Sequence, residues 1–389
     1  MNMIKTKNDG FVWGINGPVL TVQGNEFAVS EMVEVGDNAI LGEVIALKEN
    51  VAIVQVYEST TGLYPNAIVK GLKRPMSLTL CPGAVGHIFD GIMRPLEDMH
   101  KKKWKVRILA IQGDMLSGGS IFAEIEETSS ITYKAMIPPN IQGIVTHCLP
   151  DGEYFINEPL ITLQTPNKLQ TFTMSQTWPI RIPRPIAQRK RLHMPLITGQ
   201  RIIDSLFPIA KGGVAAIPGG FGTGKTMTQH QLAKWCDADL IVYIGCGERG
   251  NEMTEVLEDF SKLIDPRTGQ PLLARTILIA NTSDMPVAAR EASIYTGLSI
   301  AEGYRDMGYH CAIMADSTSR WAEALRELSG RLEEIPAEEG YPAYLATRLA
   351  AFYGRAGYVE NLNGTEGSIT IVGAVSPQGA DFSAPILYP

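Results

Sequence analysis

The stretch Gly219-Gly220-Phe221-Gly222-Thr223-Gly224-Lys225-Thr226 decides the fold of this chain. It fits the pattern G-x-x-x-x-G-K-[ST], a glycine-rich loop whose backbone N–H groups surround phosphates. We expect residues 214–217 before it to form a short buried strand and residues 227–235 after it to form a helix. A strand, a glycine loop and a helix start bring amide donors and the positive end of the helix dipole to one point. The stretch therefore predicts a nucleotide site.

Length and composition describe a folded chain with two or three domains. The chain has 389 residues, of which 45% are hydrophobic and 19% are charged. Its net charge of −7 argues against nucleic acid as the main partner, since phosphate backbones are bound by basic surfaces. One basic run, residues 100–107, is expected to be a solvated strand or loop, with a partner-binding patch as the alternative.

The sequence features that indicate cellular location favour the cytoplasm. The N-terminus lacks the apolar core of a secretory signal, and no run approaches the ~18 apolar residues that span a bilayer. Any membrane association is therefore expected to come through partners. The five cysteines have no metal-ligand spacing and are odd in number, which favours reduced thiols.

The chain has three successive regions that differ in composition. Residues 10–70 carry short β-rich runs separated by Gly, Pro and Asn, which predicts a small barrel. Residues 104–187 form a second β-rich stretch, and the proline-rich residues 178–185 at its end are expected to be an extended domain crossing. After residue 190 strands and helices alternate, with continuous apolar runs at 240–244, 276–280, 311–315 and 368–375. Such runs are typical of strands buried on both faces, so we predict an α/β domain with a mostly parallel sheet.

Three residues near the glycine loop have the chemistry to hold a nucleotide. Lys225 is placed to reach the β- and γ-phosphates, and the hydroxyl of Thr226 to ligate Mg²⁺. Asp316 ends an apolar strand, so its carboxylate is expected at the sheet edge where α/β proteins bind ligands. There it suits a carboxylate that holds a Mg²⁺-bound water, with a helix N-cap as the alternative.

Glu248 follows another apolar strand and could orient and deprotonate water for attack on the γ-phosphorus. Arg249 beside it could hold Glu248 in place or offset phosphate charge. A structural Glu248–Arg249 pair is the alternative, and Glu252 competes for the role of base. Arg320 is expected either to approach the phosphates or to pair with a glutamate of its own helix.

The longer strings around these residues resemble the catalytic A subunit of V-type and archaeal-type rotary ATPases. The resemblance runs from residue 11 to about 383 and rests on five strings, namely the glycine loop and residues 228–235 (TQHQLAKW), 243–253 (YIGCGERGNEM), 314–327 (MADSTSRWAEALRE) and 330–334 (GRLEE). It implies a RecA-like P-loop domain over residues 73–103 and 188–389, after a β-barrel at 1–72. It also implies an inserted β-rich bulge module at 104–187.

The resemblance also implies the cofactors and the site. ATP and Mg²⁺ would bind at Gly219, Gly220, Phe221, Gly222, Thr223, Gly224, Lys225, Thr226 and Met227. Glu248 becomes the water-activating carboxylate, with Lys225 and Arg249 beside it. Thr226 and Asp316, the Walker B aspartate, become the metal residues.

Partners follow from the same resemblance. Family members alternate with B subunits in an A3B3 hexamer, and the B subunit supplies an arginine finger. Central and peripheral stalks join this ring to a membrane sector that moves protons or sodium ions. The implied function is ATP hydrolysis or synthesis on the cytoplasmic face of a membrane.

The chain departs from the family pattern at three places. Gly220 stands where the family usually has proline, which predicts a more mobile loop. Thr223 stands where eukaryotic members have a redox-sensitive cysteine, so thiol regulation is not expected and a bacterial origin is favoured. The pattern stops after Ser383, whereas members continue with an aromatic wall for adenine and a helical domain that touches the rotor.

Two alternatives to the catalytic A subunit are open, and the first follows from the point where the pattern stops. A truncated, non-catalytic nucleotide-binding or assembly paralogue is one, and in it torque coupling should fail. Another hexameric P-loop ATPase, such as an export ATPase or an RNA translocase, is the second. The acidic charge and the strings around Glu248 and Asp316 count against this second alternative.

Overall fold

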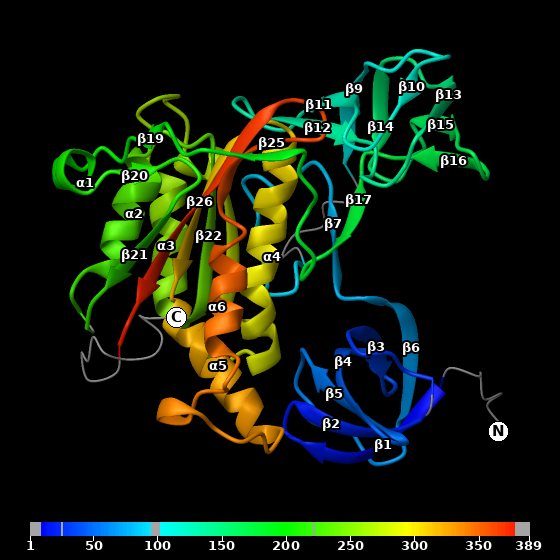
Figure 1. Cartoon of the computed structure of the whole chain (residues 1–389), viewed down its shortest axis with the longest axis vertical. Coiled ribbons are helices and arrows are strands. Elements are labelled where there is room, and N and C mark those ends of the chain that lie inside the picture. The colour runs from blue at the N-terminus through cyan, green and yellow to red at the C-terminus, as the bar shows by residue number, and fades with distance from the viewer. Residues whose placement is uncertain (1–8, 25, 95–101, 221, 378–389) are drawn as a thin grey trace.

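The structure, a computed structural model, describes residues 9–24, 26–94, 102–220 and 222–377. It has three parts, shown in Figure 1: an N-terminal β-barrel, an α/β domain, and a β-rich module that projects from the opposite end of that domain. The fold class predicted from the sequence is confirmed.

Six antiparallel strands close the N-terminal barrel in the order β1-β2-β5-β4-β3-β6. They are β1 (Asp9–Asn16), β2 (Val19–Gln23), β3 (Glu31–Val35), β4 (Ile40–Lys48), β5 (Val51–Val56) and β6 (Ile68–Pro75). Alternate side chains point inward, so Val12, Val33 and Val69 are fully buried in the barrel core. The β4–β5 hairpin turns at Glu49, whose φ is +49°.

The inserted module contains two four-stranded sheets. One has the order β12-β11-β9-β14, made of β12 (Thr132–Met136), β11 (Ile121–Glu126), β9 (Lys103–Ile108) and β14 (Gly152–Phe155). The other has the order β10-β13-β15-β16, made of β10 (Met115–Leu116), β13 (Gly143–Cys148), β15 (Ile161–Gln164) and β16 (Leu169–Phe172).

The basic run lies mainly on β9, where Trp104 and Val106 are buried while Lys103, Lys105 and Arg107 are exposed. It is therefore a strand with a solvated cationic face, although His100 and Lys101 lie outside the described residues.

The chain returns to the α/β domain through β17 (Gln176–Pro179), which pairs with β7 (Ser77–Leu80). Beyond β17, Arg181 lies between two domains and donates to Glu43 of the barrel and Glu291 of α4 (Val287–Asp306). Both carboxylates are buried, so this ion triad joins the barrel to the α/β domain.

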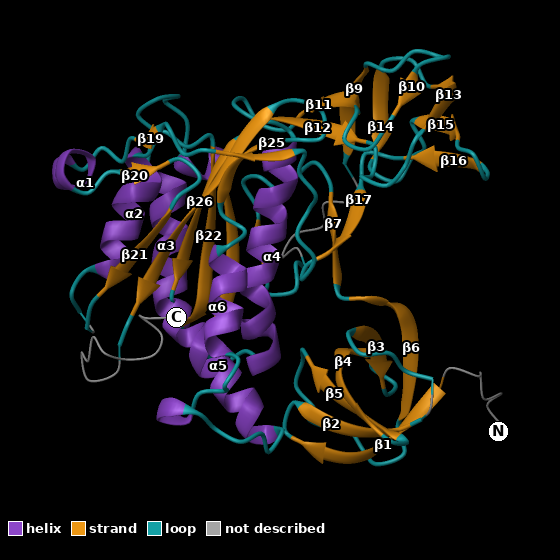
Figure 2. Cartoon of the chain, in the orientation of Figure 1, coloured by secondary structure: helices purple, strands orange, loops and turns teal. Residues whose placement is uncertain are grey.

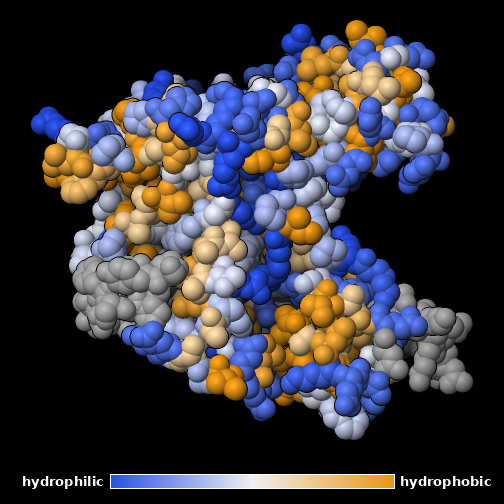
Figure 3. Space-filling view, viewed as in Figure 1, coloured by the Kyte–Doolittle hydropathy of each residue, from blue (hydrophilic) through white to orange (hydrophobic). Residues whose placement is uncertain are grey.

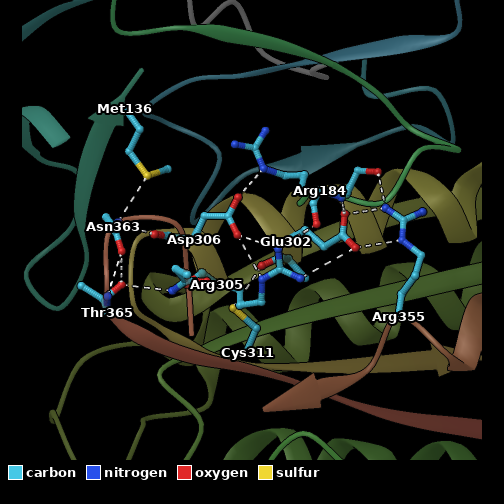
Figure 4. Close-up of polar contacts among 12 residues, drawn as sticks. Met136, Arg184, Glu302, Arg305, Asp306, Cys311, Arg355, Asn363 and Thr365 are labelled. Carbon is cyan, nitrogen blue, oxygen red and sulfur yellow. Dashed lines mark hydrogen bonds and ion pairs between the residues drawn. The ribbon is translucent and has the colours of Figure 1, made fainter. Parts of the chain in front are cut away.

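A second ion network holds the next part of the crossing (Figure 4). Arg184 Nε donates to Asp306 at 2.6 Å, and its backbone N–H donates to Glu302. Arg305 and Arg355 complete the network on the same two acids. Buried charges of this kind need their partners, so the crossing is fixed in place.

The α/β domain is built on an eight-stranded sheet of order β18-β25-β26-β24-β22-β23-β8, with β21 paired to β26. Its strands are β18 (Gln188–Lys190), β25 (Gly357–Glu360), β26 (Glu366–Val375), β24 (His310–Asp316), β22 (Leu240–Glu248), β23 (Thr276–Thr282), β8 (Ile88–Phe89) and β21 (Val214–Pro218). The pairings from β8 through β26 to β21 are parallel.

Helices cover both faces of this sheet (Figure 2). Side chains of α2 (Lys225–Trp235) and α3 (Gly250–Lys262) pack with one face, where Leu232 and Phe260 are buried. Side chains of α4, α5 (Thr318–Arg331) and α6 (Leu345–Tyr353) pack with the other.

The expectation of a buried strand at residues 214–217 is wrong in one respect. The strand forms, but β21 pairs only with β26 among the described residues, and Val214 is 49% exposed. An edge strand has one neighbour, so its other side stays open. Near it, β19 (Pro195–Leu196) pairs with β20 (Ile209–Ala210), and apolar residues of α1 (Arg201–Leu206) lie on the surface shown in Figure 3.

Within the part of the chain that the structure describes, no helix has both the length and the apolar character needed to cross a bilayer.

Candidate functional site

The glycine loop joins the edge strand β21 to helix α2, which begins at Lys225. Gly222 and Gly224 have φ angles of +76° and +86°, and an added Cβ at either would meet open space. These positions need glycine for their backbone conformation, and the open space above them leaves the loop accessible to a ligand. Lys225 Nζ and Thr223 Oγ1 both donate to the carbonyl of Gly220, at 2.7 and 2.9 Å.

Two acidic residues lie at the same edge of the sheet as the loop. Strands β22 and β24 are parallel neighbours in which Gly245 pairs with Asp316, so Glu248 and Asp316 both lie where these strands end. Helix α2 starts at this edge too, and Thr226 Oγ1 donates to Asp316 Oδ2 at 2.7 Å. This hydrogen bond joins the start of α2 to the end of β24, although the two residues are 90 apart in sequence.

A cavity of about 460 Å³ opens between these elements, within the size range of small-ligand sites. Eight of the predicted site residues line it: Gly222, Gly224, Lys225, Thr226, Met227, Glu248, Arg249 and Asp316. Gly219, Gly220 and Thr223 support the loop from outside the cavity lining, and Phe221 lies outside the described residues.

The electrostatics of the cavity centre on Glu248. Burial, the nearby charge of Asp316 and a hydrogen bond with Glu252 raise the pKa of Glu248 to about 8. Each favours the neutral carboxyl, because a second negative charge in a partly desolvated site is unfavourable. A perturbed carboxyl in a cleft is characteristic of functional sites.

Comparison with known proteins places this geometry in a family. The family model described as "ATP synthase alpha/beta family, nucleotide-binding domain" matches residues 199–388. The barrel-sandwich and beta-barrel domain models of the same family match residues 96–181 and 12–73. The chain belongs to the ATP synthase alpha/beta family.

Relatives within this family are close in sequence. The V-type ATP synthase alpha chain 2 of Clostridium tetani is 58% identical, over 97% of this chain and 67% of the relative. The A subunit of the A-type ATP synthase of Haloquadratum walsbyi is 52% identical, over 98% of this chain and 68% of the relative. The chain thus spans about two thirds of the length of these relatives, and the predicted family is confirmed.

A solved structure shares the fold at lower identity. The assembled ATPase EscN of the enteropathogenic E. coli type III secretion system matches with a TM-score of 0.68, over 97% of this chain and 72% of EscN. At 23% identity this likeness concerns the fold alone. The export-type alternative therefore gains no functional support from it.

Two open alternatives now have structural answers. The N-cap of α5 is Ser317, so Asp316 does not cap that helix. Arg320 pairs with Glu323 at 2.9 Å, which confirms the expected pair within its helix. It also lines the cavity, and its approach to phosphates stays a prediction.

In and directly behind the cavity lie residues that sequence reasoning missed or left open. Glu252, the competing candidate for the base, forms a hydrogen bond with Glu248 and lines the cavity. Glu255 of α3 lines the same cavity. Tyr243 was missed, although its hydroxyl donates to Asp316 Oδ2 at 3.0 Å. The available signal was a hydroxyl within an otherwise apolar strand, because buried tyrosine hydroxyls usually have a partner.

Proposed function

We propose that this chain is the catalytic subunit of a V/A-type rotary ATPase, with ATP hydrolysis or synthesis coupled to transport of protons or sodium ions. One observation carries the proposal. Lys225 and Thr226 of the glycine loop, Asp316 and Glu248 meet in a single cavity, in a chain 58% identical to a V-type ATP synthase alpha chain. In this proposal the arrangement would supply a phosphate cradle, a metal site and a base at one point.

The residues present fit Mg²⁺ bound together with a nucleotide. Thr226 and Asp316 offer a hydroxyl and a carboxylate within 2.7 Å of each other. Among the described residues no group of three His, Cys, Asp or Glu side chains is arranged to hold a metal alone. Mg²⁺ at nucleotide sites takes one or two protein oxygens and completes its shell with phosphates and waters, so this donor set suffices. When bound, the ion offsets phosphate charge.

In this proposal Glu248 orients the attacking water and accepts its proton. A base with a pKa near the working pH combines adequate basicity with a usable ionised fraction, and the pKa of Glu248 is about 8. Lys225 holds the terminal phosphates, and Arg249, which lines the cavity, offsets their negative charge. Loop amides from Gly219 to Met227 would bind phosphate oxygens.

We propose domain limits of 1–72 for the barrel, 104–187 for the inserted module, and 73–103 with 188–389 for the nucleotide domain. We also propose that the partner is a B subunit in an alternating A3B3 ring, with contacts to the central and peripheral stalks. The chain would then sit on the cytoplasmic face of the membrane through these partners, without binding nucleic acid.

A non-catalytic paralogue that binds nucleotide without turnover is the second candidate. The exposed edge of β21 favours it, because the strand that carries the phosphate loop lacks a neighbour on one side among the described residues. A less supported loop would bind phosphate with less preorganisation.

Phosphate release by the chain mixed with its B partner separates the two candidates. We expect Mg²⁺-dependent release that Glu248→Gln abolishes while a fluorescent ATP analogue still binds. Tight binding without turnover beside a competent B partner would favour the second candidate. Release that survives Glu248→Gln would remove Glu248 from its role.

A further inference from the structure

Tyr243 lies in the middle of β22 and is 1% exposed, yet its hydroxyl contacts Asp316, a residue that lines the cavity. It donates to Asp316 Oδ2 at 3.0 Å, the same oxygen that accepts the hydroxyl of Thr226. Resting on the proposed function, we propose that Tyr243 is a positioning residue that fixes the Asp316 carboxylate and thereby sets the affinity of the site for Mg²⁺.

The sheet register explains why this residue can reach Asp316. Tyr243 pairs with Met314 on the neighbouring parallel strand, and Asp316 lies two residues further along. Residues two apart in a strand share a face, so Asp316 is the diagonal neighbour of Tyr243. That spacing is within reach of a long aromatic side chain.

Aromatic packing holds the Tyr243 ring in this direction. His230 of α2 and Phe260 of α3 contact it edge-on, with ring centroids at 5.6 and 5.5 Å. His230 and Phe260 also pack edge-on against each other at 5.4 Å. These three rings, which we call the aromatic trio, are all buried, so the hydroxyl has one available direction.

The arrangement matters most when a cation is bound. With a cation bound, Thr226 would offer it a lone pair of the hydroxyl oxygen while its proton could still be donated to Asp316, so Thr226 would serve two groups at once. Tyr243 lies deeper than Thr226 and remains as a donor to Oδ2. Residues that hydrogen-bond to a metal ligand orient that ligand, and their removal typically costs about 10- to 100-fold in metal affinity or activity.

Tyr243→Phe tests the inference because it removes one hydroxyl and keeps the ring. The affinity of the nucleotide-bound chain for Mn²⁺, measured by electron paramagnetic resonance, is expected to fall about 10-fold or more. Binding of the fluorescent ATP analogue in EDTA is expected to stay unchanged, and so is the thermal unfolding midpoint within a few degrees.

Tyr304→Phe is the matched control. Tyr304 is also 1% exposed and donates to a carboxylate, that of Glu127 at 2.9 Å, on the side of α4 that packs with the inserted module. We expect this variant to bind Mn²⁺ as the wild type does. Phe260→Leu offers a second test, since it loosens the aromatic trio while keeping the hydroxyl, and a smaller loss of Mn²⁺ affinity is expected.

The outcomes separate this inference from the proposed function. If the wild type binds nucleotide together with Mn²⁺ and Lys225→Ala removes this binding, while Tyr243→Phe and Phe260→Leu both retain wild-type Mn²⁺ affinity, the role of Tyr243 is refuted alone. If the wild type itself binds no nucleotide together with the metal, the proposed function is refuted, whatever the variants show. An equal loss in Tyr304→Phe would also refute the role, because the effect would then be general.

Discussion

Replacing Glu248 by glutamine is expected to stabilise the nucleotide-free chain in a pH-dependent way. The pKa of Glu248 is raised to about 8 in the fold, chiefly by burial, whereas an unfolded glutamate titrates near ~4.3. Between these values the folded chain keeps a proton that the unfolded chain has lost. The free energy of unfolding therefore falls as pH rises through this window.

The expected size follows from linkage. Each pH unit inside the window changes the free energy of unfolding by about 1.36 kcal/mol per proton. Glutamine does not titrate, so the variant lacks this loss. Because the carboxyl is half ionised at its pKa of about 8, the stability gap between Glu248→Gln and wild type should widen by about 2.3 kcal/mol from pH 6 to pH 8, and it should level off above about pH 9.

Urea unfolding at pH 6, 7, 8 and 9 measures this gap. A chain with several domains unfolds in more than one step, so the transition to follow is the one that saturating nucleotide shifts. Glu258→Gln is the control, because Lys262 lowers the pKa of the exposed Glu258, and both folded and unfolded states are ionised in this range. A gap for Glu248→Gln that stays constant from pH 6 to 8 would refute the reasoning.

Further variants test other parts of the structure. Lys225→Ala should abolish binding of a fluorescent ATP analogue in titration, since it removes the cation of the phosphate loop; retained affinity would contradict the phosphate role. Arg181→Ala should lower stability by about 3–5 kcal/mol in thermal denaturation, because Glu43 and Glu291 are left buried without their shared partner, and a midpoint like that of wild type would contradict the triad. Gly247→Ala should cost about 1–2 kcal/mol, because its φ is +72° and the new Cβ would meet an arginine side chain at 2.8 Å. Phosphate release should fall with it, since Gly247 precedes Glu248, and unchanged stability and turnover would show that the position tolerates a side chain.

Sequence patterns predicted local structure well where one element determines it. The strand and helix around the glycine loop, and the strands ending near Glu248 and at Asp316, form as expected. Strand β22 extends through Glu248, beyond the apolar run at 240–244, because β23 pairs with it as far as Glu248. Helix α3 has no counterpart in the sequence prediction.

Burial was harder to predict than element type. An apolar run indicates a strand but not its place in the sheet, so the exposed edge position of β21 could not be read from residues 214–217. The contact of Tyr243 with Asp316 joins residues 73 apart, and no local pattern marks such a pair.

The sequence by itself determined the phosphate loop, because glycines with positive φ, a lysine and a threonine at a helix start specify that turn through neighbours in the chain. It also determined the family, because the strings that match the family pattern are too long for a chance match. Tertiary structure alone decided which acidic residues face the loop and which tyrosine supports Asp316. The order and register of parallel strands depend on packing across both faces of the sheet, and that packing brings together residues that are far apart in sequence.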